Sequence, residues 1–587
     1  MPQLWEIIGG GDKGGVLVRE GEGLKSKSLP RLGTGALVEE ITLNGDRLHF
    51  KLVEGEGPAE GWIAIKLPGK ELAVKTDKKP GDAAAAAAEE KAAEKAAENE
   101  APVRVPPPWR NVQVPQIEYM EIKDRAGKNE PGDYYGIKFP HSKDLIMEYG
   151  PKWLTEAFHK TGVLTKDNAV TNIFNAKEFV GGGAGLKCTF NVEYKKHKPY
   201  LHTSLFAKLP HPPKGSDRYY VSCMWNHDRP EIIFNIFLET SVPFRVPKFY
   251  FGDISAGTTN CILITEGIPW AKKSVKDFSS RKFKPFEIEP AYDKYKDWEL
   301  PDGGPMYYLA CCKALGKMAG MHKQNKLHPE IDKMFPMPGP CHEIPRGIPP
   351  MDAQSKKMQV SKLDQLCRFL KDTAKAVFPP EITDAKFLDD WMAKAQIMCE
   401  YGNEIGCFCL GAYAENPNDY VGLTHNNLQI DNAFFWRNED DKVEVGLLDW
   451  GVLGCGPLMG AIQGCISGAQ VEVLLGHRDN FLRGFIDSYA ENGGPTLDFE
   501  RMVIMNDLMM GNWSINVSQN VGHVMKNTKA KEWPEIKDWM DPKLLDRFQT
   551  RAHCTQFKYS LLLWQKWELF EKFLSFCRKV GLPEKKG

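Results

Sequence analysis

Two short stretches in the second half of the chain carry oxygen-bearing side chains at a spacing suited to binding a metal ion. The polar loop Thr424–Asn432 leads into an apolar strand, and the apolar run Val445–Leu448 ends at Asp449. A carboxylate at the end of a buried strand, beside an amide oxygen, supplies the hard ligands that Mg²⁺ prefers. We therefore predict that Asn432 and Asp449 bind Mg²⁺. The other polar, hydrogen-bonding side chains of the loop include His425, Asn427 and Asp431.

A glycine cluster before a strand is a candidate phosphate-binding loop. The segment Phe179–Leu186 is followed by the alternating strand Cys188–Tyr194, and its glycines include Gly181, Gly183 and Gly185. Glycine lets backbone N–H groups approach phosphate oxygens closely. Taken alone, the same cluster also fits an ordinary hairpin turn, so its assignment depends on the elements around it.

A single lysine within an apolar strand is the second candidate for phosphate binding. Lys208 lies in the strand-like run Ser204–Pro210, and a buried ammonium group needs a partner. The predicted helix Pro230–Glu239 provides Glu231, whose carboxylate would direct the ammonium group toward phosphates. Two alternatives stay open: Glu239 is the partner, or Lys208 points to the surface.

These residues require a sheet-rich part and a helical part to position them. From about residue 145 to 300, strand-like runs alternate with turns, and from residue 305 onward apolar residues recur at helical spacing. One strand-rich interruption, residues 423–453, carries the polar loop and Asp449. We predict a sheet-rich lobe with an amino-terminal extension over 109–300 and a helical lobe over 301–587. Its predicted helices include Met306–His322, Lys362–Val377, Lys386–Tyr401, Asn480–Asn492 and Pro542–Lys579.

The first 108 residues differ in character from the rest. Residues 1–76 consist of short apolar runs separated by glycine-rich or Asn-Gly turns, a pattern that predicts a small antiparallel barrel. This pattern resembles an SH3-like barrel, which makes a protein or peptide a candidate ligand. Trp5 and Trp62 fit either a peptide groove or the barrel core. Residues 77–108 are rich in Ala, Glu and Lys and end in prolines, which is typical of a linker.

The overall composition excludes several classes of protein. The 587 residues contain 76 Lys plus Arg and 77 Asp plus Glu, a net charge of -1, so bulk charge gives no indication of a nucleic-acid partner. No run approaches the roughly 20 apolar residues of a membrane span. The amino terminus lacks the pattern of a secretory signal, so we expect a cytoplasmic location. The 14 cysteines include no Cys-x-x-Cys pair, which favours reduced core thiols over a zinc site.

The order of these motifs resembles the protein-kinase-like fold, an α+β fold with two lobes. It runs from the glycine-rich loop through the strand lysine and the helix glutamate to the polar loop and Asp449-Trp450-Gly451. The closest resemblance is to the aminoglycoside/choline phosphotransferase branch and its ecdysteroid-kinase-like (CHK) family. That family has a characteristic His-Gly-Asp-x-x-x-Asp-Asn segment, and His425–Asn432 of this chain matches it except at two positions. Leu315–His322 resembles the family's helix with a closing Leu-Ala-x-x-His signature. The resemblance spans roughly residues 145 to 580.

This resemblance implies ATP and Mg²⁺ as cofactors and the hydroxyl of a small molecule as phosphoryl acceptor. It would make Lys208 the phosphate-binding lysine, Glu231 its ion-pair partner, and Asn432 and Asp449 the magnesium ligands. Backbone groups at the hinge between lobes would meet adenine. The remaining residues implied to bind the nucleotide are Gly181, Gly183, Gly185, Glu266 and Ile268.

One departure from the family concerns the catalytic base. The family has an aspartate two residues after the loop histidine, where it accepts the proton of the substrate hydroxyl, whereas this chain has Asn427. Asn426 replaces the preceding glycine, and Asp431 is a neighbouring carboxylate that mainly braces the loop in relatives. An amide does not accept a proton at ordinary pH, and base catalysis is worth roughly 10²–10⁴-fold in rate.

A second departure follows Asp449. Where many relatives have a Gly-x-Pro segment and then an Asp-Leu pair, this chain has Gly454–Gly460, which lacks the acid. Three functions therefore stay open: a phosphotransferase slowed at its base, a catalytically weak or inactive pseudokinase that binds nucleotide or ligand as a scaffold, and an adaptor that acts through its barrel.

Overall fold

The computed structural model describes residues 2–79, 100–112, 119–126, 128–179, 185–211, 229–273 and 282–584. Contacts between residues divide the chain into two compact units. The first comprises Met1–Ala101 with Lys198–Tyr200, and the second comprises Pro102–His197 with Leu201–Gly587. Most of the predicted linker, as well as Gly181 and Gly183, lies outside the described residues.

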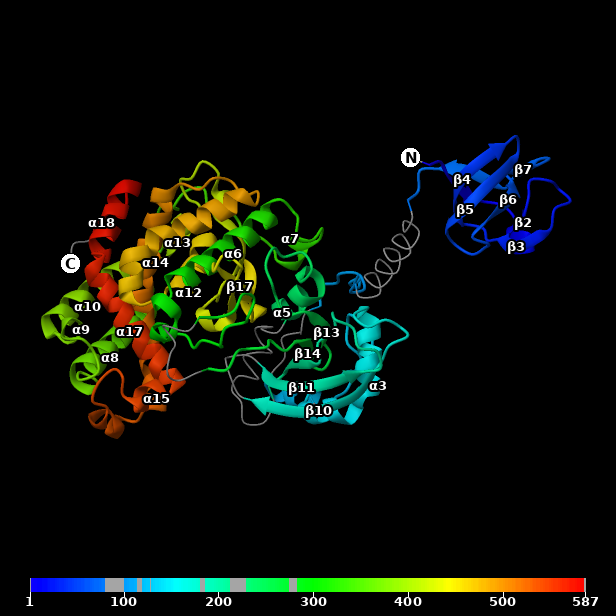
Figure 1. Ribbon diagram of the computed structural model, residues 1–587. Helices are drawn as coiled ribbons and strands as arrows, with labels where there is room; N and C mark the ends of the chain where they lie inside the picture. Colours follow the sequence, from blue (N-terminus) through cyan, green and yellow to red (C-terminus); the bar gives the residue numbers. More distant parts are fainter. Residues whose placement is uncertain are drawn as a thin grey trace. The chain divides into compact units, whose positions relative to one another are not determined.

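The first unit is a seven-stranded antiparallel sheet around one apolar core that includes Trp5 (Figure 1). Trp62 is half-buried and stacks on the His49 ring, with ring centres 4.7 Å apart. The strands, in sheet order, are β3 (Ser28–Leu32), β2 (Val16–Arg19), β6 (Glu60–Ala64), β5 (Arg47–Glu54), β4 (Leu37–Asn44), β1 (Leu4–Ile7) and β9 (Ala73–Thr76). A separate two-stranded hairpin is formed by β7 (Lys66–Leu67) and β8 (Lys70–Glu71).

The closed barrel expected for this unit is not found. Within residues 2–79, no pairing joins the outermost strands β3 and β9. The reason is that β1 pairs on both of its edges, with β4 and with β9, so the last strand ends there and does not reach β3. An all-β unit is thus present, but its sheet is open.

The second unit contains a five-stranded antiparallel sheet that carries Lys208. The alternating runs recognised in the sequence form its strands, and every residue of its last two strands is buried. Lys208 lies directly opposite Lys187 on one neighbouring strand and Leu263 on the other. In sheet order the strands are β10 (Val170–Phe179), β11 (Leu186–Tyr194), β12 (Ser204–Leu209), β14 (Asn260–Glu266) and β13 (Phe249–Ser255).

Helix α3 (Lys143–Thr161) packs against β10 and β13 of this sheet. The short helix α5 (Arg229–Ile233) continues directly into one π-helical turn, η2 (Phe234–Leu238). We call this continuous segment, residues 229–238, the Glu231 helix, because it presents the glutamate predicted to pair with Lys208.

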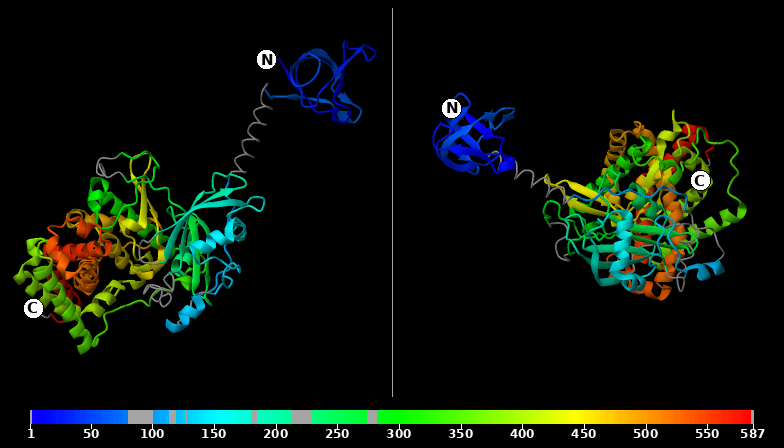
Figure 2. Two further views of the ribbon diagram at one scale, coloured as in Figure 1. Left: turned by 90° about the horizontal axis from the view of Figure 1, so that it is seen from below. Right: turned by 90° about the vertical axis from the view of Figure 1, so that its right-hand side faces the viewer.

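The remainder of the second unit is mainly helical, and its helices gather on one side of the sheet (Figures 1 and 2). The mixed α+β architecture expected from the sequence is therefore confirmed. The longer helices are α6 (Pro305–Lys323), α8 (Ala353–Arg368), α10 (Ala385–Cys399), α13 (Val471–Glu491), α14 (Phe499–Asn516), α17 (Phe548–Lys566) and α18 (Leu569–Val580). The shorter ones are α7 (Ile331–Met334), α9 (Pro380–Thr383), α11 (Gly402–Cys409), α12 (Leu458–Ile466), α15 (Val521–Asn527) and α16 (Pro542–Leu545). Helix α2 (Tyr119–Ala126) instead adjoins the sheet, where the Asn260 side chain of β14 donates to the Ala126 carbonyl at 3.0 Å.

Three predicted helices have clearly different bounds from those expected. Helix α13 begins at Val471, nine residues before the expected Asn480. The run Pro542–Lys579 is interrupted twice. The first break lies at Arg547, which has an extended conformation between α16 and α17, and the second lies at Glu568, whose left-handed φ of 51° separates α17 from α18. Helix α8 begins nine residues before the expected Lys362, at Ala353, because the Asp352 carboxylate caps it by accepting hydrogen bonds from two backbone N–H groups.

Helices α6 and α13 approach each other closely because α6 has glycines on the facing side. A Cβ atom on Gly316 would lie 2.5 Å from the Phe485 carbonyl oxygen, and one on Gly320 would lie 2.5 Å from that of Tyr489. These glycines belong to the Leu315–His322 segment, so packing alone accounts for their presence there.

The strand-rich interruption forms two pairs of strands within the helical part. Strand β15 (Val421–His425) pairs with β18 (Leu453–Pro457), and β16 (Ala433–Arg437) pairs with β17 (Val443–Leu447). The polar loop follows β15 and Asp449 follows β17, so the two loops are brought together by the ends of these strands.

His322, at the end of α6, braces the strand that leads into the polar loop, and we expect it to make stability sensitive to acid. Its Nδ1 accepts a hydrogen bond from the Leu423 N–H at 3.3 Å, and burial lowers its pKa from 6.5 to about 4. A folded-state pKa below the unfolded value gives stability that is present above pH 6.5 and is lost as the pH falls toward 4.

Urea unfolding at pH 7.5 and at pH 5 tests this expectation. Between pH 7.5 and pH 5, the free energy of unfolding should fall by about 1–2 kcal/mol less in His322→Gln than in the parent. The reason is that only the parent has this buried imidazole, which binds a proton more readily in the unfolded chain than in the folded one. The same substitution at the exposed His342 is the control and should leave the parent's acid sensitivity intact. Equal acid sensitivity in parent and His322→Gln would contradict the assignment.

Among the described residues, no helix is long and apolar enough to cross a membrane. Nine of the cysteines within these residues are buried. Cys311 and Cys312 on α6 meet Cys465 on α12 in the middle of the helical part. The expectation of reduced core thiols agrees with this arrangement.

Candidate active site

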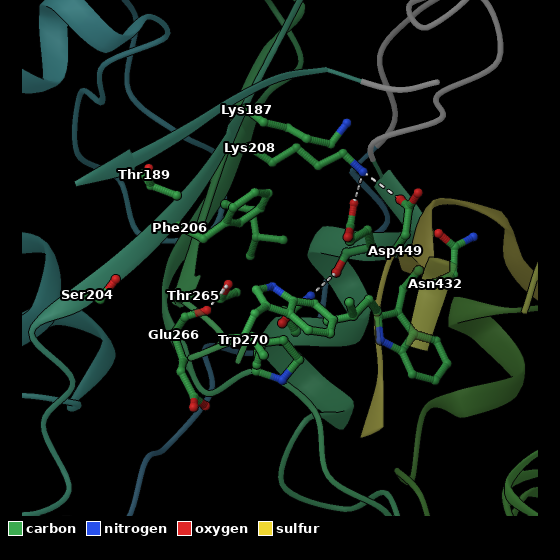
Figure 3. Close-up of a pocket in the computed structure, with 18 of the residues that line it drawn as sticks. Lys187, Thr189, Ser204, Phe206, Lys208, Thr265, Glu266, Trp270, Asn432 and Asp449 are labelled. Atoms are coloured by element: carbon green, nitrogen blue, oxygen red, sulfur yellow. Dashed lines mark hydrogen bonds and ion pairs between the residues drawn. The ribbon is translucent and has the colours of Figure 1, made fainter. Parts of the chain in front are cut away.

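A cavity of about 540 Å³ lies between the five-stranded sheet, the Glu231 helix and the two loops that follow β15 and β17. The residues that line one end are charged or amidic: Lys187, Lys208, Glu231, Asn432 and Asp449. The residues at the other end come from the last residue of β14 and the segment that follows it: Glu266, Ile268 and Trp270. Figure 3 shows these two groups separated by apolar side chains that include Phe206.

Lys208 is held between two carboxylates. Its side chain is 6% exposed and forms ion pairs with Glu231 and with Asp449, the latter with 2.8 Å between Nζ and Oδ1. Glu239, the competing partner, instead binds Arg104 at 3.1 Å. The alternative in which Lys208 points to the surface does not hold, because a buried ammonium group between two acids faces the cavity (Figure 3).

Asp449 follows β17 in a left-handed conformation, with a φ of 57° and a ψ of 66°. This conformation is unfavourable for most residues other than glycine, and such strain is often found at functional sites. Burial by itself would raise the pKa of Asp449, but the attraction of the Lys208 ammonium group and its hydrogen bond outweigh burial and lower the pKa to about 2. Asp449 is thus a carboxylate at any ordinary pH.

Asn432 is oriented by the loop in which it lies. Its side-chain amide nitrogen donates to the Asn427 carbonyl at 2.7 Å, and its own backbone carbonyl accepts from the Leu448 N–H at 2.8 Å. Because the nitrogen is engaged, the amide oxygen is the end that faces Asp449, as Figure 3 shows. One carboxylate and one amide oxygen on adjacent loops fit Mg²⁺, which completes its octahedron with water and phosphate oxygens.

No group of three or more His, Cys, Asp or Glu side chains within the described ranges is arranged to hold a metal ion. A metal site supplied entirely by such side chains is therefore not seen there. The donor pair Asn432 and Asp449 suits an ion that arrives with a ligand such as a polyphosphate.

His425 lies beneath the site and not at its surface. It is fully buried, its Nε2 donates to the Leu448 carbonyl at 2.8 Å, and its Nδ1 accepts from the Asn427 N–H at 3.3 Å. Burial lowers its pKa, which favours the neutral ring that this pattern of donor and acceptor requires. His425 therefore ties the polar loop to the Asp449 loop by hydrogen bonds.

The two other loop residues predicted to act in catalysis lie at different depths. Asn427 is half-buried, and its backbone carbonyl orients Asn432. Asp431 lines the cavity, with Oδ2 3.4 Å from the Lys294 ammonium group. Its buried Oδ1 has no hydrogen-bond partner within the described part of the chain. Burial raises the pKa of Asp431, and Lys294 opposes this effect.

The predicted nucleotide residues at the ends of the sheet are also near the cavity. Ile268 and Glu266 line it, and the Glu266 carboxylate accepts hydrogen bonds from Arg245 at 2.7 Å and from the Lys248 N–H at 3.2 Å. Gly185, with a φ of 65°, lies where a Cβ atom would be 2.6 Å from the Leu209 carbonyl oxygen. Glycine is therefore required at the base of the loop, next to Lys208.

Sequence reasoning missed several residues of the site, above all Lys187. This lysine lies directly opposite Lys208 on the neighbouring strand, so both side chains extend from the same face of the sheet into the cavity. The signal was present in the sequence, because strand alternation from Gly185 places Lys187 and Thr189 on one face. Phe234 of the Glu231 helix was also missed, and its ring stacks on Trp450 with centres 3.7 Å apart.

No family model and no curated protein matches this chain. Solved structures with some similarity include an aminopropanol kinase associated with a microcompartment, at 12% identity and a TM-score of 0.31, covering 70% of this chain and 94% of that one. An ethanolamine kinase of Plasmodium vivax is 11% identical with a TM-score of 0.32, covering 77% and 98%.

The GDP complex of an aminoglycoside 2'-phosphotransferase is 10% identical with a TM-score of 0.32, covering 67% of this chain and 93% of the other.

Proposed function

We propose that the second unit is a nucleotide-dependent phosphotransferase of the protein-kinase-like fold. ATP would occupy the cavity with its phosphates at Lys208 and its base toward Glu266 and Ile268, and a hydroxyl of a small molecule would accept the γ-phosphoryl group. The observation that carries this proposal is the buried Lys208, paired with Glu231 and Asp449 at the polar end of the cavity. A cation fixed in this way is positioned to contact phosphate oxygens.

In the proposed reaction, different residues of the site position the phosphates, bind the metal ion and hold the loops together. Phosphoryl transfer relies mainly on positioning and on neutralising charge. Glu231 keeps Lys208 in place, while the contact of Lys208 with Asp449 gives way to phosphate oxygens when a nucleotide binds. Mg²⁺ held by Asn432 and Asp449 would neutralise phosphate charge. His425 and Asn432 keep the two loops in register.

Removal of the proton from the acceptor hydroxyl is the step for which this site is least well equipped. Asn427 can orient a hydroxyl through its amide oxygen, but it cannot remove the proton. Asp431 is a carboxylate in the cavity, and one of its oxygens has no hydrogen-bond partner among the residues that the structure describes, although Lys294 attracts the group to one side. We therefore propose a slow phosphotransferase.

A pseudokinase scaffold is the second candidate, and Asn427 is the observation that favours it. In that case the cavity binds nucleotide in the same way, but no phosphoryl group is transferred. The two candidates share every expectation about binding and differ only in turnover.

Two finer assignments belong to the same proposal. Membership of the ecdysteroid-kinase-like (CHK) family is supported by the matches at His425–Asn432 and at Leu315–His322. A protein or peptide ligand of the first unit is supported by its small all-β architecture and by the exposed apolar side chains of Leu24 and Leu67.

Thermal unfolding and turnover assays on the full chain test the proposal. ATP with Mg²⁺ at about 100 times its Kd should stabilise the protein by about 2.7 kcal/mol. Radiolabelled ATP with a panel of small alcohols and amino alcohols then separates the phosphotransferase from the scaffold. The absence of stabilisation by ATP with Mg²⁺ would contradict both candidates.

Lys187 provides a test of where the phosphates lie. Replacing it by methionine should raise the Kd for ATP roughly tenfold, equivalent to about 1.4 kcal/mol, because a second ammonium group beside Lys208 would be lost. The Kd for AMP, which has one phosphate close to the sugar, should change much less. Isothermal titration calorimetry with both nucleotides measures the two values.

The control for Lys187→Met is Lys152→Met, which removes an exposed lysine of α3 and should change neither Kd. If Lys187→Met weakened ATP and AMP equally, the phosphates would not lie beside Lys187.

A further inference from the structure

The segment that leads into the second unit, residues 102–112, lies along the Glu231 helix, and we call it the strap. Near its start, the Arg104 guanidinium donates hydrogen bonds to the carbonyls of Ile236 at 2.8 Å and Asn235 at 3.1 Å. It also pairs with Glu239 at 3.1 Å, and its side chain is only 6% exposed. Cations interact favourably with the carboxyl end of a helix, where carbonyl groups lack partners within the helix.

The guanidinium of Arg104 is fixed from its other face as well. It lies over the ring of Phe249 in β13, with 4.5 Å between the guanidinium carbon and the ring centre. Arg104 therefore joins the sheet to the carboxyl end of the Glu231 helix through one side chain.

The end of the strap holds the opposite end of the same helix. Arg229, the first residue of the helix, donates from Nε to the Val112 carbonyl at 2.8 Å and from a terminal nitrogen to the Asn111 side-chain oxygen at 3.1 Å. The Arg110 carbonyl accepts from the Tyr134 hydroxyl at 3.0 Å, and the Tyr134 ring packs edge-on against Phe237. The helix is thus held by the strap at its first residue and near its last.

The Glu231 helix contacts both the lysine and the residue next to Asp449 at the charged end of the cavity. Glu231 binds Lys208, and Phe234 stacks on Trp450, the residue after Asp449. A helix this short is marginal on its own, because few hydrogen bonds offset the cost of its nucleation. Its position therefore depends on what packs against it. A displacement at Arg104 would be transmitted to Glu231 within the same ten residues.

We infer that Arg104 is a positioning residue for the Lys208–Glu231 ion pair, and that the strap determines whether this pair forms. The strap overlaps the end of the predicted linker, residues 77–108. Because the strap holds both ends of the Glu231 helix, an event that displaces residues 102–112 would open the ion pair. Its effect on phosphoryl transfer rests on the proposed function, but its effect on Lys208 does not.

The full-length variant Arg104→Gln tests this inference, with the acetylation of Lys208 as the measurement. A brief pulse of acetic anhydride, followed by mass spectrometry, reports how well the ammonium group is protected. We expect Lys208 to be labelled several-fold faster in Arg104→Gln than in the parent, because Glu231 no longer stays beside it. Arg104→Lys, which restores a cation at this place, should give an intermediate rate.

Arg501 offers a matched control elsewhere in the second unit. Its guanidinium donates to the carbonyls of Phe408 at 2.9 Å and Ala412 at 2.7 Å, and it lies 4.0 Å from the centre of the Phe408 ring. Arg501→Gln therefore removes the same kinds of contact without touching the Glu231 helix. It should leave the labelling of Lys208 at the parental rate, even if it lowers the unfolding temperature.

Two outcomes would overturn the inference. One is that Arg104→Gln labels Lys208 at the parental rate. The other is that Arg104→Gln and Arg501→Gln accelerate it equally, which would indicate general loosening of the fold. If Arg104→Gln does not fold, the labelling rate of Lys208 in Arg104→Lys decides the matter. A rate above that of the parent, together with a parental rate in Arg501→Gln, supports the inference. A parental rate in Arg104→Lys overturns it.

Nucleotide binding separates this inference from the proposed function. In the parent, ATP with Mg²⁺ should slow the labelling of Lys208, and in Arg104→Gln the Kd for ATP should rise roughly tenfold, or about 1.4 kcal/mol. If ATP gave no protection in the parent, the proposed function would fail, while the labelling contrast among the variants would still test the strap.

Discussion

Replacing Asp449 by asparagine should reduce phosphoryl transfer by at least about two orders of magnitude. A metal ion that neutralises phosphate charge lowers the barrier by several kcal/mol, and each 1.36 kcal/mol is about tenfold in rate. Asp449 is the one carboxylate of the predicted metal pair, and its pKa of about 2 keeps it ionised. An amide in its place retains the size of the side chain but removes the charge that attracts Mg²⁺.

The same variant should show the opposite effect when Mg²⁺ is absent. Without the metal ion, Asp449 repels the phosphates of ATP and also competes for Lys208 through their contact at 2.8 Å. Asp449→Asn should therefore bind ATP more tightly than the parent in the presence of EDTA, and more weakly in the presence of Mg²⁺. Titration calorimetry under both conditions measures this crossing.

Asp332→Asn serves as the control, because its exposed carboxylate lies on the short helix α7 and outside the cavity lining. It should bind ATP as the parent does under both conditions. A variant Asp449→Asn whose dependence on Mg²⁺ equals that of the parent would show that the metal ion, if bound, is held elsewhere.

Replacing Asn427 by aspartate should raise the rate of phosphoryl transfer by roughly 10²–10⁴-fold, the range that general-base catalysis supplies. The substitution places a carboxylate where the resemblance to the CHK family implies the base. Since Asn427 contributes its backbone carbonyl to the orientation of Asn432, the side-chain change should leave the Kd for ATP with Mg²⁺ nearly unchanged. The effect should thus appear in kcat and not in nucleotide binding.

Asn426→Asp is the matched control for this experiment. It introduces the same charge one residue earlier, on an exposed side chain, and should not accelerate the reaction. If the parent is inactive and Asn427→Asp is active, the scaffold is the correct function for the parent. If both variants bind ATP and neither transfers phosphate faster than the parent, position 427 is not the place of the base.

The residues whose place in the cavity could be predicted from the sequence are those with an unusual local pattern. Lys208 stands out because it is charged within an apolar strand, and Glu231 because it lies in a short helix nearby. Asn432 ends a polar loop directly before a buried strand, and Asp449 comes just after one. In all these cases the neighbouring residues in the sequence determine the environment of the side chain.

The residues that could not be predicted depend on contacts between distant parts of the chain. Arg104 binds backbone carbonyls more than 130 residues away. Since every residue has a backbone carbonyl, the sequence gives no indication of which one will bind a side chain. The break at Glu568 could not be located either, because neither glycine nor proline marks it. The sheet of the first unit is open because β9 pairs with β1 and not with β3. The alternation of apolar and polar residues within a strand does not determine which strand becomes its neighbour.

The buried thiols give this protein a set of built-in reporters of local opening. A thiol reacts with a disulfide reagent only when its surroundings open, so the rate of its modification measures the free energy of that opening. Cys188 lies in β11 beside the candidate active site, Cys311 and Cys465 lie at the centre of the helical part, and Cys577 lies in the last helix. Following each cysteine by mass spectrometry would show which of these regions opens first, in the unmodified chain and without introducing a probe.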